Sequence, residues 1–530
     1  MSDITIGGRS ISKAAVAAVA SVAVLSGLFI SRMFSLKPSR NRKLRYTQGP
    51  RAETVQETVQ RIRENVSRKR TCKYIPDVTT ETWSAYWREQ QLYGIHDMLK
   101  ENAAELYEAA KADIGKPYSE FVLELNALLM DVRAIIKDVR LWMQPEYKKT
   151  PLFLQPSSSY IQYEPFGVAL IISAWNAPAA TGLMPLCAAL AAGNACIFKP
   201  SEFAPFQSDF FAKYLPKYVD PDAVAVILGE AEVAKQCVAA DIDFCFFTGS
   251  GRIGLHVAKS CAERFIPYIL ELGGKCPCII DVNCNLEVMA RRLIQGKMIN
   301  AGQICLSPDH VIIIGDEKRA RKVIDEHVIP EIKRQYGEVP FDQPELMTQI
   351  INSTHVKRLK AVLDGAKNYV VHGGKMDESR RFIEPTVLLM DPVEAEELDI
   401  FKDEIFGPIL PVVYLSSLEQ AVEFVSNRKN PLAVYMFSRN QKNISYIMSK
   451  IATGSVCIND CCFQAMNPHL PFGVSFFATD VKTRRNVTND VDVSRVFVSQ
   501  VWEDITESTD LLGAQMQKQL WYEAIVWISP

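Results

Sequence analysis

The sequence has little net charge, few histidines and no regular cysteine spacing. Its 530 residues carry a formal net charge of −2 at pH 7. Nucleic-acid binding, which favours a basic stripe, is therefore not expected. The 13 cysteines form no paired C-x-x-C sets, and with only 7 histidines the chain offers no candidate metal site. Scattered thiols on a chain of this length are typical of a reducing compartment, and the length predicts two or three domains.

The N-terminus lacks acidic residues between Asp3 and Glu53. Residues 14–31 (AAVAAVASVAVLSGLFIS) carry no charge, and this stretch is close to the ~20 residues of a membrane-spanning helix. Cations follow it, so we predict a membrane anchor and basic linker over 1–50, with a helix at about 14–31. The rest of the chain would then face the cytosol, at the endoplasmic reticulum or the mitochondrial outer membrane.

Two alternatives apply to this N-terminal segment. A cleaved secretory signal has similar composition but carries its positive charge on the other flank. A mitochondrial import sequence remains open, because such sequences are also poor in acidic residues.

The pattern of apolar residues predicts an α/β fold. Residues 52–145 have mainly helical periodicity, and from about residue 160 short apolar runs alternate with helical segments. Uninterrupted apolar strands with intervening helices indicate a parallel sheet covered on both faces. We expect strands at 168–172, 195–199, 223–228, 244–247 and 268–272. A second alternating region follows, with strands at 278–282 and 310–314, a helix at 286–299 and a long helix near 316–335. The glycine pair at 273–274 marks the predicted boundary, which separates domains 51–272 and 273–473.

Gly249, Gly251 and Gly254 have the G-x-G-x-x-G spacing of a dinucleotide-binding turn. Glu271 lies farther along, where a ribose-binding acid is found in such folds. Glycine also serves at ordinary tight turns, so this pattern alone leaves open whether Glu271 binds a ribose or takes part in chemistry.

Cys305 lies in the stretch NAGQICLSPD at 300–309, where its thiol could face a cleft. A thiolate attacks carbonyl carbons readily, and it requires a lowered pKa or a nearby base to form. Taken alone, a single cysteine is more often a small buried apolar residue.

Six motifs together carry more information than this cysteine alone. They are SAWNAP (173–178), KPSE (199–202), FTGS (247–250), LELGGK (270–275), GQIC (302–305) and EIFGP (404–408). In order and approximate spacing, residues 51–473 resemble the aldehyde dehydrogenase superfamily, and most closely its class-three, fatty-aldehyde branch. The resemblance implies a Rossmann-type NAD-binding domain at 51–272 and an α/β catalytic domain at 273–473.

The resemblance also implies a role for each catalytic residue. Cys305 would attack the aldehyde to give a thiohemiacetal, whose oxyanion the Asn176 amide and the Cys305 backbone N–H would stabilise. After hydride transfer to nicotinamide, Glu271 would act as the general base that activates water to hydrolyse the thioester. Glu271 is therefore interpreted as the base and not as a ribose ligand.

The cofactor would contact a second set of residues. Lys199 and Glu202 would bind the adenosine ribose, Glu404 the nicotinamide ribose, and Phe406 would pack on the ring. The pyrophosphate would lie near Gly249, Ser250 and Gly254, where helix N–H groups favour anions. Without the motifs, the three charged residues would be interpreted as solvated surface groups. Because Glu202 would repel a 2′-phosphate, we expect NAD, with NADP as the alternative.

Small side chains surround the predicted oxyanion donor. Ala177, Ala179 and Ala180 stand where relatives usually carry bulkier groups, so we expect a wider approach to the nucleophile. A membrane anchor and a wide approach to the nucleophile favour medium- or long-chain fatty aldehydes as substrates. An apocarotenoid or aromatic aldehyde is the alternative substrate. The resemblance further implies a homodimer.

The C-terminal tail, residues 474–530, departs from the family pattern. No glycine occurs between Gly473 and Gly513, whereas relatives continue with a glycine-rich turn. One interpretation is read-through of an unspliced intron, since Val474 and Ser475 can be encoded by GTAAGT. Loss of the family's C-terminal motif would give a catalytically impaired membrane-bound protein, which is the alternative to an active enzyme.

Overall fold

The computed structural model describes residues 53–69, 84–470 and 472, together with short strands at 4–6, 9–11 and 496–499. Strands β1 (Ile4–Ile6) and β2 (Arg9–Ile11) form an antiparallel pair in a separate unit, Met1–Arg45. The predicted anchor helix at 14–31 lies outside the described residues. Within the described part of the chain, no helix combines the length and the apolar composition needed to cross a bilayer.

Among the residues that the structure describes, four helices precede the first large sheet, which confirms the helical prediction for the described part of 52–145. They are α2 (Val55–Lys69), α3 (Ala85–Glu101), α4 (Ala103–Ile114) and α5 (Tyr118–Trp142). The apolar face of α2 is buried through Val55, Val59, Ile62 and Val66. Their alternating spacing of four and three residues places these side chains on one face.

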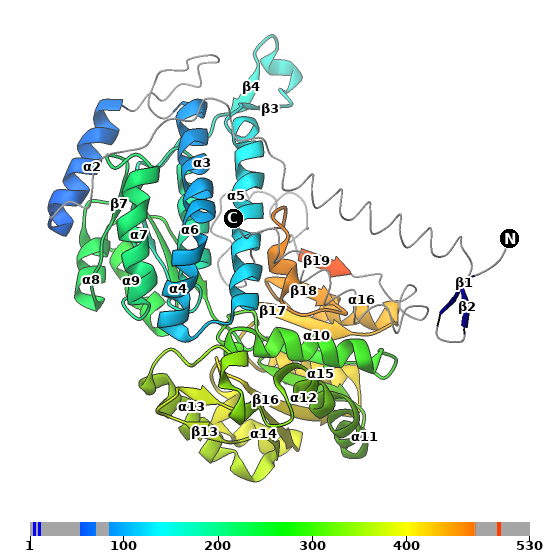
Figure 1. The fold of residues 1–530 in the computed structure, drawn as a ribbon. Coiled ribbons are helices and arrows are strands. Elements are labelled where there is room, and N and C mark those ends of the chain that lie inside the picture. The colour runs from blue at the N-terminus through cyan, green and yellow to red at the C-terminus, as the bar shows by residue number, and fades with distance from the viewer. Residues whose placement is uncertain are drawn as a thin grey trace. The chain divides into compact units, whose positions relative to one another are not determined.

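The first large sheet has five strands in the order β7-β6-β5-β8-β9, and every neighbouring pair is parallel (Figure 1). The strands are β5 (Val168–Ile172), β6 (Ala195–Lys199), β7 (Val224–Val226), β8 (Phe244–Gly249) and β9 (Tyr268–Leu272). Helices α6 (Pro178–Ala191), α7 (Pro205–Tyr218), α8 (Ala231–Ala239) and α9 (Gly251–Ala262) connect the strands. All five predicted strands are confirmed. Because parallel strands end at the same edge, Lys199, Gly249 and Glu271 come to one edge of the sheet.

The second large sheet has eight strands in the order β12-β15-β16-β11-β10-β17-β18-β19. In this sheet β12 and β15 are antiparallel, and each of the other neighbouring pairs is parallel. The strands are β10 (Pro277–Ile280), β11 (His310–Ile314), β12 (Val370–His372), β15 (Thr386–Met390), β16 (Ile409–Leu415), β17 (Ala433–Phe437), β18 (Ser455–Ile458) and β19 (Val496–Ser499). Thus the part of the tail that the structure describes adds a strand to this sheet.

The predicted helix at 286–299 is confirmed as α10 (Leu286–Met298), whereas the long helix predicted near 316–335 is interrupted. It consists of α11 (Glu317–Val323), a π-helical turn at Ile324–Val328 and α12 (Ile329–Tyr336). Pro330 has no N–H with which to continue the regular helical ladder, which accounts for the interruption.

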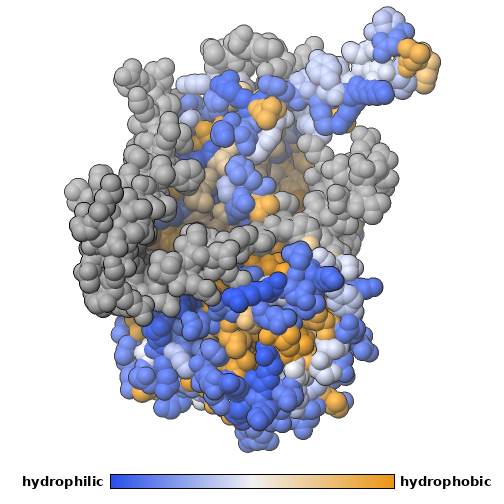
Figure 2. All heavy atoms as spheres, turned by 90° about the vertical axis from the view of Figure 1, so that its right-hand side faces the viewer, coloured by the Kyte–Doolittle hydropathy of each residue, from blue (hydrophilic) through white to orange (hydrophobic). Residues whose placement is uncertain are grey.

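A hairpin arm with an apolar tip leaves the first sheet region. It comprises β3 (Glu146–Lys148), a short turn at Leu152–Leu154 and β4 (Ser159–Ile161). Leu152 and Phe153 are 88% and 84% exposed at its end. The arm projects near the top of Figure 1, and Figure 2 shows hydrophobic atoms at its end.

Helix α7 is capped from another helix. Its own N-cap residue, Ala204, has no side chain that could accept a hydrogen bond. Instead the Asp113 carboxylate at the end of α4 accepts from the Phe206 and Gln207 backbone N–H groups, each at 3.0 Å. A carboxylate at this position satisfies orphan donors and also complements the helix dipole.

We predict that Asp113→Ala lowers the free energy of unfolding by about 1–3 kcal/mol, because two buried N–H groups lose their acceptor. The urea midpoint of the purified protein measures this change. Asp113→Asn keeps one acceptor oxygen and should lose less. An unchanged midpoint in Asp113→Ala would contradict the capping role.

Candidate active site

Cys305 lies in a loop that follows α10 and a short helical turn at Ile299–Gly302. Its side chain is partly buried, and the backbone of the loop is held from two sides. The Cys276 thiol donates to the Cys305 carbonyl oxygen at 3.4 Å, and the Tyr435 hydroxyl donates to the Leu306 carbonyl oxygen at 2.6 Å. The candidate nucleophile is therefore anchored to residues at β10 and β17.

Three consecutive residues before this loop have left-handed backbone conformations. The φ angles are 55° at Asn300, 53° at Ala301 and 71° at Gly302. Residues with a Cβ rarely adopt this conformation. Glycine is required at position 302 for a second reason, because a Cβ there would collide with the Gly407 carbonyl oxygen. The chain thus reaches Cys305 through a strained turn.

The Gln303 side chain is fully buried and holds this turn in place. Its Nε2 donates to the carbonyl oxygens of Asn300 and Gln349, each at 3.0 Å, and its Oε1 accepts from the Ile351 N–H at 3.1 Å. Its own carbonyl oxygen accepts from the Asn176 Nδ2 at 2.9 Å. The predicted oxyanion donor is therefore bonded directly to the nucleophile loop.

Two partly buried carboxyl groups, those of Glu271 and Glu404, share the electrostatic environment of the thiol. Burial raises the pKa of Glu271, on β9, to about 8. Burial and the charge of Asp309 raise the pKa of Glu404 to about 8. Burial, followed by the negative charges of Glu404 and Glu271, raises the pKa of the Cys305 thiol well above its ordinary value. The structure thus brings the predicted nucleophile, base and ribose ligand into one interacting group, and it holds the thiol protonated.

A buried ion pair connects three of the motifs. The Lys275 ammonium bonds to the Asp309 carboxylate and to the Asp403 carbonyl oxygen. The other Asp309 oxygen accepts from the Ile405 N–H at 2.8 Å. Although burial acts in the opposite direction, the charge of Lys275 keeps the pKa of Asp309 below its usual range. The sequence prediction gave Lys275 and Asp309 no role, although Lys275 lies in the LELGGK motif and Asp309 ends the stretch quoted at 300–309.

Aromatic side chains form one wall beside the Asn176 segment. The ring centroids of Trp175 and Phe406 are 5.4 Å apart, and those of Trp175 and His355 are 5.0 Å apart. Burial and the charge of Arg358 lower the pKa of His355 to about 4, so its imidazole is neutral near pH 7. His355 belongs to α13 (Ser353–Gly365), and the sequence prediction missed it because no motif contains a histidine.

Lys199 and Glu202 lie together at the end of β6. The Lys199 side chain is only 2% exposed, and its Nζ bonds to the Glu202 Oε2 at 2.9 Å. The surface interpretation is therefore wrong for Lys199. A buried ammonium beside a partly exposed carboxylate provides both a donor and an acceptor for ribose hydroxyls.

The glycines of the G-x-G-x-x-G pattern differ in what surrounds them. A Cβ at Gly249 would lie 2.6 Å from the Phe247 ring, and a Cβ at Gly254 would lie 2.8 Å from Leu272. At Gly251 a Cβ would meet no atom within 4 Å. Thus two positions are restricted to glycine by close packing, and Gly251 is not.

The start of α9 fits an anionic group. Ser250 occupies the N-cap position, yet its side chain accepts no hydrogen bond from the first helical turn. The free N–H groups and the open space at Gly251 suit a pyrophosphate at this helix end. Together with the Lys199–Glu202 pair, these features fit a nicotinamide dinucleotide. Among the described residues, no group of three or more metal-ligating side chains is present.

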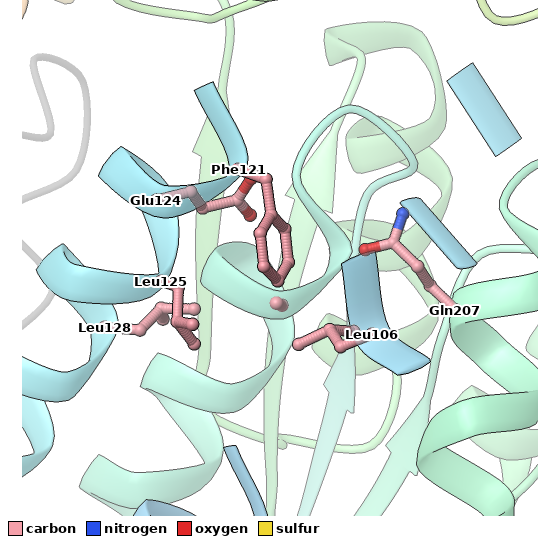
Figure 3. A pocket seen from close by; sticks show the side chains of 7 residues that line it. Leu106, Phe121, Glu124, Leu125, Leu128 and Gln207 are labelled. Atoms are coloured by element: carbon pink, nitrogen blue, oxygen red, sulfur yellow. The ribbon is translucent and has the colours of Figure 1, made fainter. Parts of the chain in front are cut away.

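A small cavity lies among α4, α5, α6 and α7 (Figure 3). Its lining consists of Leu106, Phe121, Glu124, Leu125, Leu128, Ala179 and Gln207. The lining includes none of the predicted catalytic residues. Ala179 lines this cavity, and Ala177 does not. A substitution at Ala179 is therefore expected to affect the cavity, whereas one at Ala177 is expected to affect the approach to the thiol.

Comparisons with known proteins identify relatives over most of the chain. The pattern of the "Aldehyde dehydrogenase family" matches residues 35–474. Aldehyde dehydrogenase family 3 member B3 of Mus musculus is 37% identical over 402 residues, which are 74% of this chain and 81% of that protein. The dimeric NADP-preferring aldehyde dehydrogenase of Rattus norvegicus is 34% identical, over 79% of this chain and 88% of that protein.

A solved structure supports the same assignment. The substrate-bound state of AldH from Staphylococcus aureus has a TM-score of 0.73 and 30% sequence identity, and covers 79% of this chain and 88% of that chain. Relatives from family 3 agree with the class-three resemblance of the motifs. The chain belongs to the aldehyde dehydrogenase family, and it is an oxidoreductase that acts on aldehydes.

Proposed function

We propose that this enzyme oxidises apolar, medium- or long-chain fatty aldehydes to carboxylic acids through a thioester on Cys305. The observation that carries this proposal is the cluster of Cys305, Glu271 and Glu404, in which the two carboxyl charges add to burial in raising the pKa of the thiol. Asn176 adds an amide bonded to the same loop. Perturbed carboxyl groups beside a nucleophile are typical of catalytic sites.

In the first step the Cys305 sulfur bonds to the aldehyde carbon. The thiol is protonated at rest, so its proton has to leave to a base, and Glu271 is the group that accepts it. A carboxylate whose pKa is raised by burial is a stronger base than an ordinary one.

Asn176 stabilises the oxyanion that forms on the former carbonyl oxygen. One hydrogen of its Nδ2 is bonded to the Gln303 carbonyl oxygen, which fixes the orientation of the amide. The second hydrogen is then available to the substrate oxygen. Because the bond to Gln303 already orients the amide, little reorganisation is required during the reaction.

A bound nicotinamide dinucleotide supplies the hydride acceptor. Lys199, Glu202, Gly249, Ser250, Gly254, Glu404 and Phe406 are the residues that would hold it. Glu202 favours NAD through repulsion of a 2′-phosphate, and NADP is the alternative. After the proton taken from Cys305 has passed to solvent, Glu271 takes a proton from water, which attacks the thioester. The acid leaves and the Cys305 thiolate is protonated again.

The proposal extends to the location and assembly of the enzyme. The charge-free stretch at 14–31 supports a membrane anchor with the catalytic part in the cytosol, where apolar aldehydes would be met at a lipid surface. The exposed apolar tip at Leu152–Leu154 supports a homodimer, since such surfaces are usually covered by a partner.

We predict that Cys305→Ser abolishes NADH formation from NAD and decanal. In Glu271→Gln the steady-state turnover should fall by about 10²-fold or more, because hydrolysis lacks its base, and the burst of NADH should be slower as well, because the thiol loses its proton acceptor. Stopped-flow fluorescence distinguishes the two phases. Equal turnover in Cys305→Ser and the natural chain would remove Cys305 from the mechanism, and no turnover in the natural chain would favour an impaired protein.

The pKa of Glu271, about 8, predicts the pH dependence of turnover. The base acts when ionised, so kcat should rise with pH up to about 8 and level off above it. Below that pH, kcat should fall roughly tenfold per pH unit, as expected for protonation of one group. Glu404→Gln is the matched control, because its carboxyl group has a similar pKa. If the fall of kcat below pH 8 disappeared in Glu404→Gln at saturating NAD, that fall would report the protonation of Glu404 and not of Glu271.

We predict that Ala177→Phe narrows the approach to the thiol. The ratio of kcat/KM for decanal to that for propanal should fall by about tenfold or more, since pocket size discriminates chain length. Ala179→Val is the control, because Ala179 faces the separate helical cavity and should leave this ratio unchanged. An unchanged ratio in Ala177→Phe would contradict the predicted approach.

A further inference from the structure

A carboxylate from α5 reaches the strained turn before the nucleophile loop. The Glu120 Oε2 accepts from the Asn300 backbone N–H at 2.9 Å, across 180 positions of sequence. Asn300 is the first of the three left-handed residues and is almost completely buried. Its N–H therefore has little access to water as an alternative acceptor.

The Glu120 carboxylate is itself held in place. The same Oε2 accepts from the Thr348 hydroxyl at 2.8 Å, and Thr348 is buried. The following residue, Gln349, donates its N–H to the Ile114 carbonyl oxygen at 2.7 Å, at the end of α4. The corner between α4 and α5 thus holds the segment at 348–349 and the Asn300 N–H through adjacent contacts.

The corner between α4 and α5 is connected through hydrogen bonds to the loop that carries Cys305 and also to the Asn176 amide. The Gln349 carbonyl oxygen accepts from the Gln303 side chain, and the Gln303 carbonyl oxygen accepts from the Asn176 amide. The Asn300 side chain also donates to the Asn176 carbonyl oxygen at 3.0 Å. A displacement at Asn300 would therefore move the amide as well as the loop that carries Cys305.

We propose that Glu120 is a positioning residue for the reaction, which holds the left-handed turn at 300–302 in the conformation that presents the Cys305 thiol beside the Asn176 amide. This inference rests on the proposed role of Cys305 as nucleophile. The geometry assigns Glu120 no contact with substrate or cofactor. Its effect passes through the backbone of the turn.

Ala301 provides an independent way to examine the proposal. It has a φ of 53° and is 1% exposed, so its Cβ is held in a disfavoured conformation inside the protein. Glycine adopts this conformation readily. If the carboxylate serves to maintain the turn, then Ala301→Gly should partly replace it.

The test compares Glu120→Ala, Glu120→Gln and the double variant Glu120→Ala/Ala301→Gly in the full chain. For Glu120→Ala we expect kcat with decanal to fall by about 10- to 100-fold, since small misplacements of reacting groups have effects of this size. NADH binding, measured by fluorescence titration, should change less than about threefold, because Glu120 lies outside the predicted cofactor residues. Alkylation of Cys305 by iodoacetamide, followed by peptide mass spectrometry, should change in rate in the same variant.

Two rescues distinguish positioning from general stability. Glu120→Gln keeps an acceptor oxygen for both donors and should retain kcat close to that of the natural chain. Ala301→Gly should recover a large part of kcat in the Glu120→Ala background. If Glu120→Ala is insoluble, Glu120→Asp withdraws the oxygen from Asn300 and should give an intermediate loss that Ala301→Gly also reduces.

Two results would overturn the inference. One is a Glu120→Ala protein with unchanged kcat and an unchanged alkylation rate. The other is a loss of kcat that neither Glu120→Gln nor Ala301→Gly restores. Cys305→Ser, assayed in parallel, separates this failure from failure of the proposed mechanism. Turnover that survives in Cys305→Ser would contradict the proposed mechanism. If Cys305→Ser loses turnover while Glu120→Ala keeps normal turnover, only the positioning role of Glu120 is contradicted.

Discussion

The left-handed turn at 300–302 is the local constraint on which the arrangement around the thiol depends. A left-handed residue with a Cβ is disfavoured by about 1–2 kcal/mol, so the conformation persists only where the surroundings enforce it. Here those surroundings are the Glu120 carboxylate, the Gly407 backbone and the adjacent Gln303 side chain, which is itself bonded to the distant Gln349 and Ile351 backbone. The loop that carries Cys305 is therefore held by contacts with residues distant in sequence.

A second constraint follows from charge at the site. Two carboxyl groups and a thiol interact electrostatically at the site, and the buried ion pair of Lys275 with Asp309 holds the Ile405 backbone. Burial therefore dominates the pKa values of Glu271 and Glu404. A site arranged in this way favours proton acceptance by its carboxyl groups over a permanently ionised nucleophile.

Much of the fold could be predicted from the sequence, because the five apolar runs of the first sheet are uninterrupted and alternate with helices. The motifs likewise pointed to Cys305, Glu271 and Asn176. In the structure Asn176 is bonded to the loop that carries Cys305, and the charge of Glu271 acts on the thiol, whereas their catalytic roles stay predictions. Glu120 and His355 were missed, since their importance depends on contacts with residues far away in sequence. The interruption of the helix near 316–335 was also missed, although Pro330 was a visible signal. The predicted anchor and most of the tail lie outside the described residues.

Under the proposed mechanism, the raised pKa of the Cys305 thiol also affects its reaction with oxidants. Peroxides react with the thiolate and hardly at all with the neutral thiol, so a sulfur kept protonated between turnovers is slow to form sulfenic acid. The neighbouring Cys276 is protected in the same way, because burial raises its pKa and its S–H is bonded to a carbonyl oxygen. The reactive form of the sulfur would then exist mainly while an aldehyde is being processed.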